Sequence, residues 1–215
     1  MKLGTSYWSR PLKRIGRFEI AWGVGLVLAA VITSTASFSD VCGQIRSTTL
    51  RLHIRAASDS AADQADKLAV RDAVVQAAGE LFQDARSLRT AKQIAESDLE
   101  QLQQTAQDVL EQRGSPYTAK TYLTRMYFAT THYDGFTMPA GQYDALRVDI
   151  GPATGKNWWC VLFPPLCLPA AEPEIQNTLY TEAQQAVMQN GYEIRFAVVE
   201  LFQRLAKDLP VYDGC

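Results

Sequence analysis

Hydrophobic and polar residues alternate in two segments of the chain, and this period of two predicts β-strands. In residues 50–56 every second side chain is apolar, and residues 143–150 show the same pattern. Two further segments, 118–133 and 158–163, are rich in β-branched or aromatic residues, which favours strands. In the first strand the apolar positions would face the core. The side chains expected on its opposite, solvent-facing side are Arg51, His53 and Arg55.

Apolar residues spaced three and four apart predict helices between these strands. The first expected helix follows Ser60, because Ser60 and Asp63 have the spacing of a capping box, and its apolar stripe continues toward Phe82. The second runs from about residue 90 to residue 113. It is expected to end at Gly114, because glycine commonly follows the last turn of a helix.

The C-terminal part predicts a helix over 176–190, a strand over 192–199 and a helix over 201–209. The sum is an α+β fold, an antiparallel sheet with helices packed on one face, preceded by an N-terminal signal or anchor helix. The expected organisation after this helix is a linker (37–49), a single domain (50–209) and a tail (210–215).

The first 36 residues have the layout of a secretory signal peptide. A basic opening segment precedes an apolar run over 20–32, and small residues follow it. We expect cleavage at Ser34-x-Ala36, while residues 20–38 could alternatively form an uncleaved membrane anchor. In both cases the basic residues stay on the cytoplasmic side, so the remainder of the chain is expected to be exported.

Charge and length limit the classes of partner. The whole chain has 215 residues and a formal net charge of −2. The leader holds five of the 21 Lys and Arg and one of the 23 Asp and Glu, which leaves a net charge of about −6 on the remainder. No basic block or stripe remains there. Nucleic acid is therefore excluded as the expected partner, and the membrane is expected to be contacted only through the N-terminal segment.

Four cysteines stand at positions 42, 160, 167 and 215. An even number of cysteines in an exported protein invites disulfides. Cys160 and Cys167 are close enough in sequence for a local bridge, which would contribute roughly 2–3 kcal/mol to stability. The alternative is that Cys160 is a buried free thiol. A pairing of Cys42 with Cys215 stays open.

Few catalytic patterns are present. The two histidines form no His-x-x-x-His pair and the cysteines form no Cys-x-x-Cys cluster, so no metal site is expected. Residues 151–157 resemble a phosphate loop superficially, but the segment is one residue short and ends in Asn157, where Ser or Thr would bind magnesium. We interpret it as a hairpin loop between two strands. No cofactor is expected, and neither a nucleophile elbow nor an aspartic-protease motif occurs.

Two adjacent tryptophans point to a binding surface. Trp158 and Trp159 must face opposite sides of their strand, so one can lie in the core. The other must be covered by a helix or remain available, and an exposed tryptophan beside the rigid Pro164–Pro165 bend would be a good binding anchor.

Several of these segments closely resemble the stage II sporulation protein R family of endospore-forming bacteria. The resemblance extends from Leu50 to about Phe202, and its most specific motif is Gly155–Cys167, which reads Gly-Lys-Asn-Trp-Trp-Cys-Val-Leu-Phe-Pro-Pro-Leu-Cys. The other matching motifs are Arg51-Leu-His53, Ser58-Asp-Ser60, Asp63-Gln64, Lys67–Asp72 and Pro139–Arg147.

The resemblance implies a role that composition cannot show. Members of this family are exported from the forespore into the space between forespore and mother cell. There they trigger a membrane-embedded aspartic protease, which processes the precursor of sigma factor E. The family supplies no catalytic residues to carry over. The residues expected to contact the protease are Arg51, His53, Asp59, Trp158, Trp159, Pro164 and Pro165.

Two other functions stay open from the residues alone. An exported enzyme acting on cell-wall material could use His53 with a nearby carboxylate such as Asp59 as acid and base. A purely structural envelope protein would need no defined site.

Overall fold

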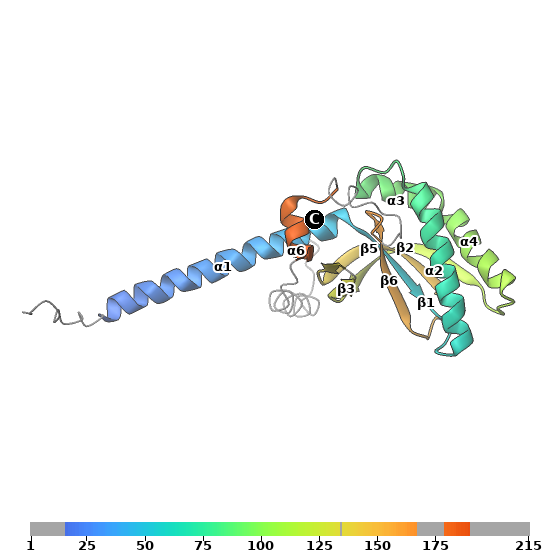
Figure 1. Cartoon of the computed structure of the whole chain (residues 1–215), viewed down its shortest axis with the longest axis horizontal. Helices are drawn as coiled ribbons and strands as arrows, with labels where there is room; N and C mark the ends of the chain where they lie inside the picture. The colour runs from blue at the N-terminus through green and yellow to red at the C-terminus, as the bar shows by residue number, and fades with distance from the viewer. Residues whose placement is uncertain (1–15, 134, 167–178, 190–215) are drawn as a thin grey trace, which may run out of the picture. The chain divides into compact units, whose positions relative to one another are not determined.

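The computed structural model describes residues 16–133, 135–166 and 179–189. The chain forms two compact units, divided between Ser37 and Phe38. Figure 1 shows the elements along the chain. In order they are α1 (Arg17–Thr48), β1 (Leu50–Arg55), α2 (Ala61–Leu81), α3 (Leu88–Ser97), α4 (Leu99–Gln112), β2 (Ala119–Phe128), β3 (Thr131–Tyr133), β4 (Phe136–Met138), β5 (Gly141–Ile150), β6 (Asn157–Phe163) and α6 (Glu182–Gln189).

The second unit contains a four-stranded sheet in the order β2-β5-β1-β6. Strand β1 runs parallel to β5, whereas the β1–β6 and β2–β5 pairs are antiparallel. The predicted α+β class is confirmed, but the sheet is mostly rather than purely antiparallel. Between β1 and β5 the chain passes through three helices and three strands, and a connection of that length allows parallel neighbours.

The prediction of a hairpin loop over residues 151–157 was wrong. Strand β1 lies between β5 and β6, so this loop joins two strands that are not neighbours and passes the C-terminal end of β1. A parallel pairing of β5 with β1 takes the place that β6 would have occupied in a hairpin. Alternation within each strand was read correctly, but alternation does not identify the neighbouring strand.

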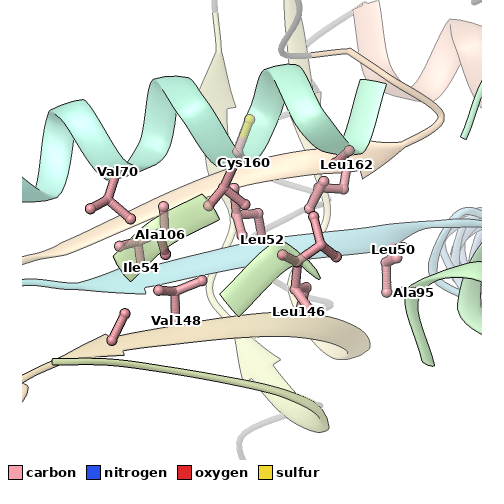
Figure 2. Packing of buried hydrophobic residues seen from close by; sticks show 14 of the residues in the cluster. Leu50, Leu52, Ile54, Val70, Ala95, Ala106, Leu146, Val148, Cys160 and Leu162 are labelled. Carbon is pink, nitrogen blue, oxygen red and sulfur yellow. The ribbon is translucent and has the colours of Figure 1, made fainter. Parts of the chain in front are cut away.

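One face of the sheet is covered by α2, α3 and α4 (Figure 1). Figure 2 shows apolar side chains of β1, β5 and β6 gathered with those of the helices. Helix α2 contributes Val70, Val74 and Ala78, which are fully buried and spaced four residues apart. Its start agrees with the sequence prediction, because the Ser60 side chain accepts a hydrogen bond from the Asp63 backbone N–H at 3.1 Å.

The helix predicted over 90–113 is in fact two helices. Helix α3 ends at Ser97 and α4 begins at Leu99, with Asp98 serving as the boundary of both. Helix α3 contacts β1 and α2, whereas α4 contacts α2 and β2. The break lets the two apolar faces meet different strands, and an apolar stripe in the sequence cannot show such a change of partner. Gly114 follows the last helix as expected, with a φ of 65°.

Two side chains of α4 accept hydrogen bonds from backbone N–H groups of the edge strand β2. Gln107 accepts a hydrogen bond from the Ala119 N–H at 2.9 Å, and Gln103 accepts one from the Thr121 N–H at 3.0 Å. Unpaired N–H groups on an edge strand invite pairing with another chain. The glutamines cover this edge at those two positions.

The opposite face of the sheet is covered at one end by the last turns of α1, by α6 and by the β3–β4 hairpin. Phe38, Cys42 and Ile45 of α1 are buried there, in a cluster that also contains Tyr143. The predicted linker over 37–49 is therefore helical up to Thr48, because these side chains have a core to pack against. Cys42 carries a free thiol, and burial raises its pKa to about 11.

The described part of the first unit, residues 16–37, is helical from Arg17 onward. Large apolar side chains project from it, among them Phe18 and Trp22, which are 84% and 74% exposed. Among the described helices, none combines the length and the apolar character needed to cross a membrane. The signal peptide and its cleavage remain predictions.

Helix α6 falls within the helix predicted over 176–190. The strand predicted over 192–199 and the helix predicted over 201–209 lie outside the described residues, as does the tail.

Candidate functional site

The family motifs that lie far apart in sequence meet at one corner of the domain, where β1 leads into α2. The carboxylate of Asp59 accepts a hydrogen bond from the Lys156 backbone N–H at 2.7 Å. Two further backbone bonds join the same segments, from Thr154 N–H to Ala57 O at 3.2 Å and from Gly155 N–H to Ala56 O at 3.0 Å. The loop after β5 is thereby fixed against the start of α2.

Lys67 of α2 also contributes to this corner. Its ammonium group donates to the Gln64 side chain at 2.7 Å and to the backbone oxygen of Lys156 at 3.3 Å. Burial lowers the pKa of Lys67. Both Asp59 and Lys67 bind the backbone of Lys156, in the loop between β5 and β6. Their role is therefore structural: they hold this loop against the start of α2.

Arg51 lies fully buried on the opposite face of the sheet from α2. Its guanidinium carbon lies 4.4 Å from the ring centre of Phe128 and 5.1 Å from that of Tyr143. Nε donates to the Cys160 backbone oxygen at 3.0 Å, and Nη2 donates to the Tyr133 hydroxyl at 2.7 Å. Nη1 has no hydrogen-bond partner, and within the described part of the chain no carboxylate pairs with this cation.

His53 is the next residue of β1 on that face, and only 4% of its surface is exposed. Its Nε2 lies 2.8 Å from the Asn157 side-chain oxygen, so Nε2 carries the proton and donates. Nδ1 is buried without a partner. Burial lowers the pKa of His53, and the positive charges of Arg147 and Arg55 act in the same direction, against the hydrogen bond to Asn157.

Next to His53 the sheet face becomes charged. Arg147 Nε donates to the Asp149 carboxylate at 2.9 Å, and the Tyr122 hydroxyl donates to the other oxygen of that carboxylate at 2.8 Å. The side chains of Arg147 and Asp149 are 23% and 18% exposed. We call this charged part of the sheet the His53 face. Its members are His53, Arg55, Lys120, Tyr122, Arg147, Asp149, Asn157 and Trp159.

The structure brings together some of the predicted site residues and separates others. Arg51, His53 and Trp159 share one face, with the His53 and Trp159 rings 6.3 Å apart between centres. Trp158 lies on the other face, half-buried under Arg71, whose guanidinium carbon is 4.5 Å from the ring centre. Asp59 lies at the corner, in neither group.

Two expectations about exposure need correction. Arg51 and His53 were expected on a solvent-facing side but are buried, because rings from β2, β5 and β6 cover that side. Pro164, expected to contact the protease, is buried in the turn after β6, and Pro165 is half-buried. For the two tryptophans the choice between coverage and availability stays open, because both are partly exposed.

Of the two cysteines in the predicted Cys160–Cys167 disulfide, only Cys160 lies within the described residues. Cys160 lies in the core beneath α2, as Figure 2 shows. Cys167 lies outside the described residues, so the Cys160–Cys167 pairing stays a prediction.

His53 and Asp59, the acid–base pair of the enzyme hypothesis, are each hydrogen-bonded to a different group. His53 binds the Asn157 side chain, whereas Asp59 accepts from the Lys156 backbone. Within the described residues no group of three or more His, Cys, Asp and Glu is arranged to hold a metal ion.

Sequence reasoning missed several members of the His53 face. Alternation in β5 placed Arg147 and Asp149 on one side of the strand, which was the available signal for them. Asn157 stands within the Gly155–Cys167 motif. Tyr122 gave no signal, because its importance follows from the pairing of β2 with β5.

Acidification is expected to destabilise the protein through His53. The folded state lowers the pKa of His53 below its ordinary value of 6.5, so the unfolded chain binds the proton at higher pH. Stability is therefore fully present above about pH 6.5 and falls as the pH drops below it, by about 1.4 kcal/mol for each tenfold difference in proton affinity between the states. Urea unfolding between pH 7.5 and pH 5 measures this.

The matched variants are His53→Gln and His132→Gln, since His132 is exposed. His53→Gln should flatten the pH dependence and His132→Gln should preserve it. An unchanged slope in His53→Gln would show that other groups cause the acid sensitivity.

Comparison with known proteins places these motifs in a family. A family model described as stage II sporulation protein R matches residues 46–173, which include the whole four-stranded sheet and the corner. The curated stage II sporulation protein R of Bacillus subtilis (strain 168) is 36% identical over 118 residues, 55% of this chain and 53% of that protein. The chain thus spans about half the length of this curated relative. No solved structure matches. Because the family model covers more than half of its residues, the chain belongs to the stage II sporulation protein R family.

Proposed function

We propose that this protein is an exported sporulation signal. It acts between forespore and mother cell by binding and activating a membrane-embedded aspartic protease, which then processes the precursor of sigma factor E. The observation that carries the proposal is the family match over residues 46–173. The proposal includes export through the N-terminal segment, where a basic start precedes an apolar helix.

Activation by binding needs a difference in affinity. A binding protein activates an enzyme when it binds the active state more tightly than the inactive state. Turning an enzyme from about 1% to about 99% active requires roughly a 10⁴-fold preference. A rigid surface on a sheet is suited to this role, because little conformational entropy is lost on binding.

Co-expression tests the proposal directly. The full chain, the cognate membrane protease and the sigma-factor precursor are produced together in a host without sporulation genes, and precursor cleavage is followed by immunoblot. We expect cleavage with the full chain and none when the chain is omitted. Cleavage that is equally strong without the chain would refute activation.

A second arm tests export. A chain lacking residues 1–36 should accumulate in the cytoplasm and leave the precursor uncleaved. Full cleavage by this cytoplasmic form would contradict action across the membrane.

A third arm separates binding from catalysis. The enzyme hypothesis requires the His53 imidazole, so His53→Gln should abolish function if that hypothesis holds. If the protein acts by binding, we expect His53→Gln to retain precursor cleavage at pH 7.5, because the His53 ring is buried, is not available for contact with a partner, and donates only to Asn157.

A further inference from the structure

The face of the sheet opposite α2 has two different halves. One half is packed under α1, α6 and the β3–β4 hairpin, in a cluster that contains Phe128 and Tyr143. The other half is the His53 face, to which the covering helices contribute no member. There Lys120 and Asn157 are exposed, while Arg55, Tyr122 and Trp159 remain partly exposed.

Cations outnumber acids on the His53 face. Arg55 and Lys120 both stand in register with Asp149, from the strands on either side of β5. Asp149 is already occupied by Arg147 and the Tyr122 hydroxyl. Arg55 and Lys120 therefore have no ion-pair partner within the described part of the chain, and the face carries an excess of two positive charges.

Aromatic rings lie among these cations. The Tyr122 ring centre lies 5.7 Å from the Lys120 ammonium and 5.8 Å from the Arg147 guanidinium. Trp159 lies beside His53, where its partly exposed ring packs against the cluster that contains Phe128 and Tyr143. Cations combined with Tyr and Trp are the composition found at the energetic centres of protein interfaces.

The charge of this face differs from that of the protein around it. The chain beyond its leader is acidic, so an acidic partner would be repelled by most of its surface. Opposite charges across an interface increase the association rate and fix the orientation of the partner. An acidic segment would therefore be directed to the His53 face, where Arg55 and Lys120 add two positive charges.

We propose that the His53 face is the docking surface for an acidic peptide segment on the extracytoplasmic side of the membrane partner. This inference rests on the proposed function for the identity of that partner. Carboxylates of the segment would bind Arg55 and Lys120, and its apolar side chains would cover Tyr122 and Trp159.

Charge reversal tests the surface in the co-expression assay. Arg55→Glu with Lys120→Glu should lower precursor cleavage at least about tenfold. The matched control is Arg86→Glu with Arg89→Glu, which makes the same charge change at exposed positions on the helix-covered side. Those two positions flank the start of α3, where acidic residues are tolerated. The control should cleave like wild type, and a loss equal to that of the test pair would overturn the inference.

A milder variant guards against misfolding. Arg55→Gln with Lys120→Gln removes the charge without placing a carboxylate beside Asp149, and we expect about a threefold to tenfold loss. Wild-type cleavage by both the Glu and the Gln pair would overturn the docking surface while leaving the proposed function intact.

Two binding measurements on the full chain in detergent do not depend on the protease. A fluorescent ten-residue poly-glutamate peptide should bind wild type in a salt-sensitive way and bind the Glu pair at least about tenfold more weakly. Binding unaffected by the Glu pair overturns the inference. Vesicles containing phosphatidylglycerol provide the second probe. If the Glu pair lowers vesicle binding but not peptide binding, the face recognises lipid and the inference fails.

Discussion

Replacing Arg51 by alanine is expected to lower the free energy of unfolding by about 3–5 kcal/mol. The guanidinium carbon lies 4.4 Å and 5.1 Å from the ring centres of Phe128 and Tyr143, and the group donates to the Cys160 backbone oxygen and the Tyr133 hydroxyl. Alanine would leave a cavity where the long Arg51 side chain lies, which is costly inside a protein. Urea unfolding of the full chain, followed by tryptophan fluorescence, measures the loss.

Arg51→Met separates the effect of charge from that of volume. Methionine fills a similar space without a charge to desolvate, and replacing a buried charge by an apolar residue is often close to neutral. We expect Arg51→Met to cost less than about 1.5 kcal/mol. A loss as large as that of the alanine variant would show that the contacts of the cation outweigh the cost of burying it.

The second large effect is expected at Gly155. A Cβ at this position would collide with the backbone oxygen of Ser58, in the segment that leads into α2. The collision is with backbone, so the corner must open to relieve it, which breaks hydrogen bonds such as Thr154 N–H to Ala57 O. Gly155→Ala should destabilise the protein by about 1–3 kcal/mol.

Gly43→Ala is the matched control for Gly155→Ala. A Cβ at Gly43 meets only an Arg46 side-chain nitrogen at 3.7 Å, an ordinary contact, and the residue lies inside helix α1. Alanine favours helix over glycine, so this variant should gain up to about 1 kcal/mol. If Gly155→Ala were as stable as wild type, the corner would be looser than the contacts indicate.

These two sites differ in how far the sequence predicted them. The motif around Gly155 is conspicuous, but the sequence predicts a hairpin for its loop, because nothing local shows that β1 lies between β5 and β6. Arg51 was placed on the correct side of β1 but in the wrong environment. Alternation shows which residues share a side, whereas burial of that side depends on rings from β2, β5 and β6.

For the His53 face too, the sequence predicts some members, whereas others depend on tertiary structure. The sequence identifies His53 and Trp159, since both stand in conspicuous motifs. It does not predict their relation to Tyr122 and Lys120, because the register of β2 on β5 brings together residues that are 25 to 29 positions apart in sequence. Strand pairing is a long-range event, and its register is determined by packing of the whole sheet.

The amino-acid sequence by itself determined the local elements: where β1, β5 and β6 lie, that Ser60 starts a helix, and which family motifs the chain carries. These depend on the residue period and on caps within a few positions. Only the tertiary structure decided that β1 pairs parallel to β5, that Asp59 binds the Lys156 backbone, and that a buried Arg51 borders a charged, partly exposed surface. Such contacts join residues about 90 positions apart, and their stability depends on shape and burial that no local pattern encodes.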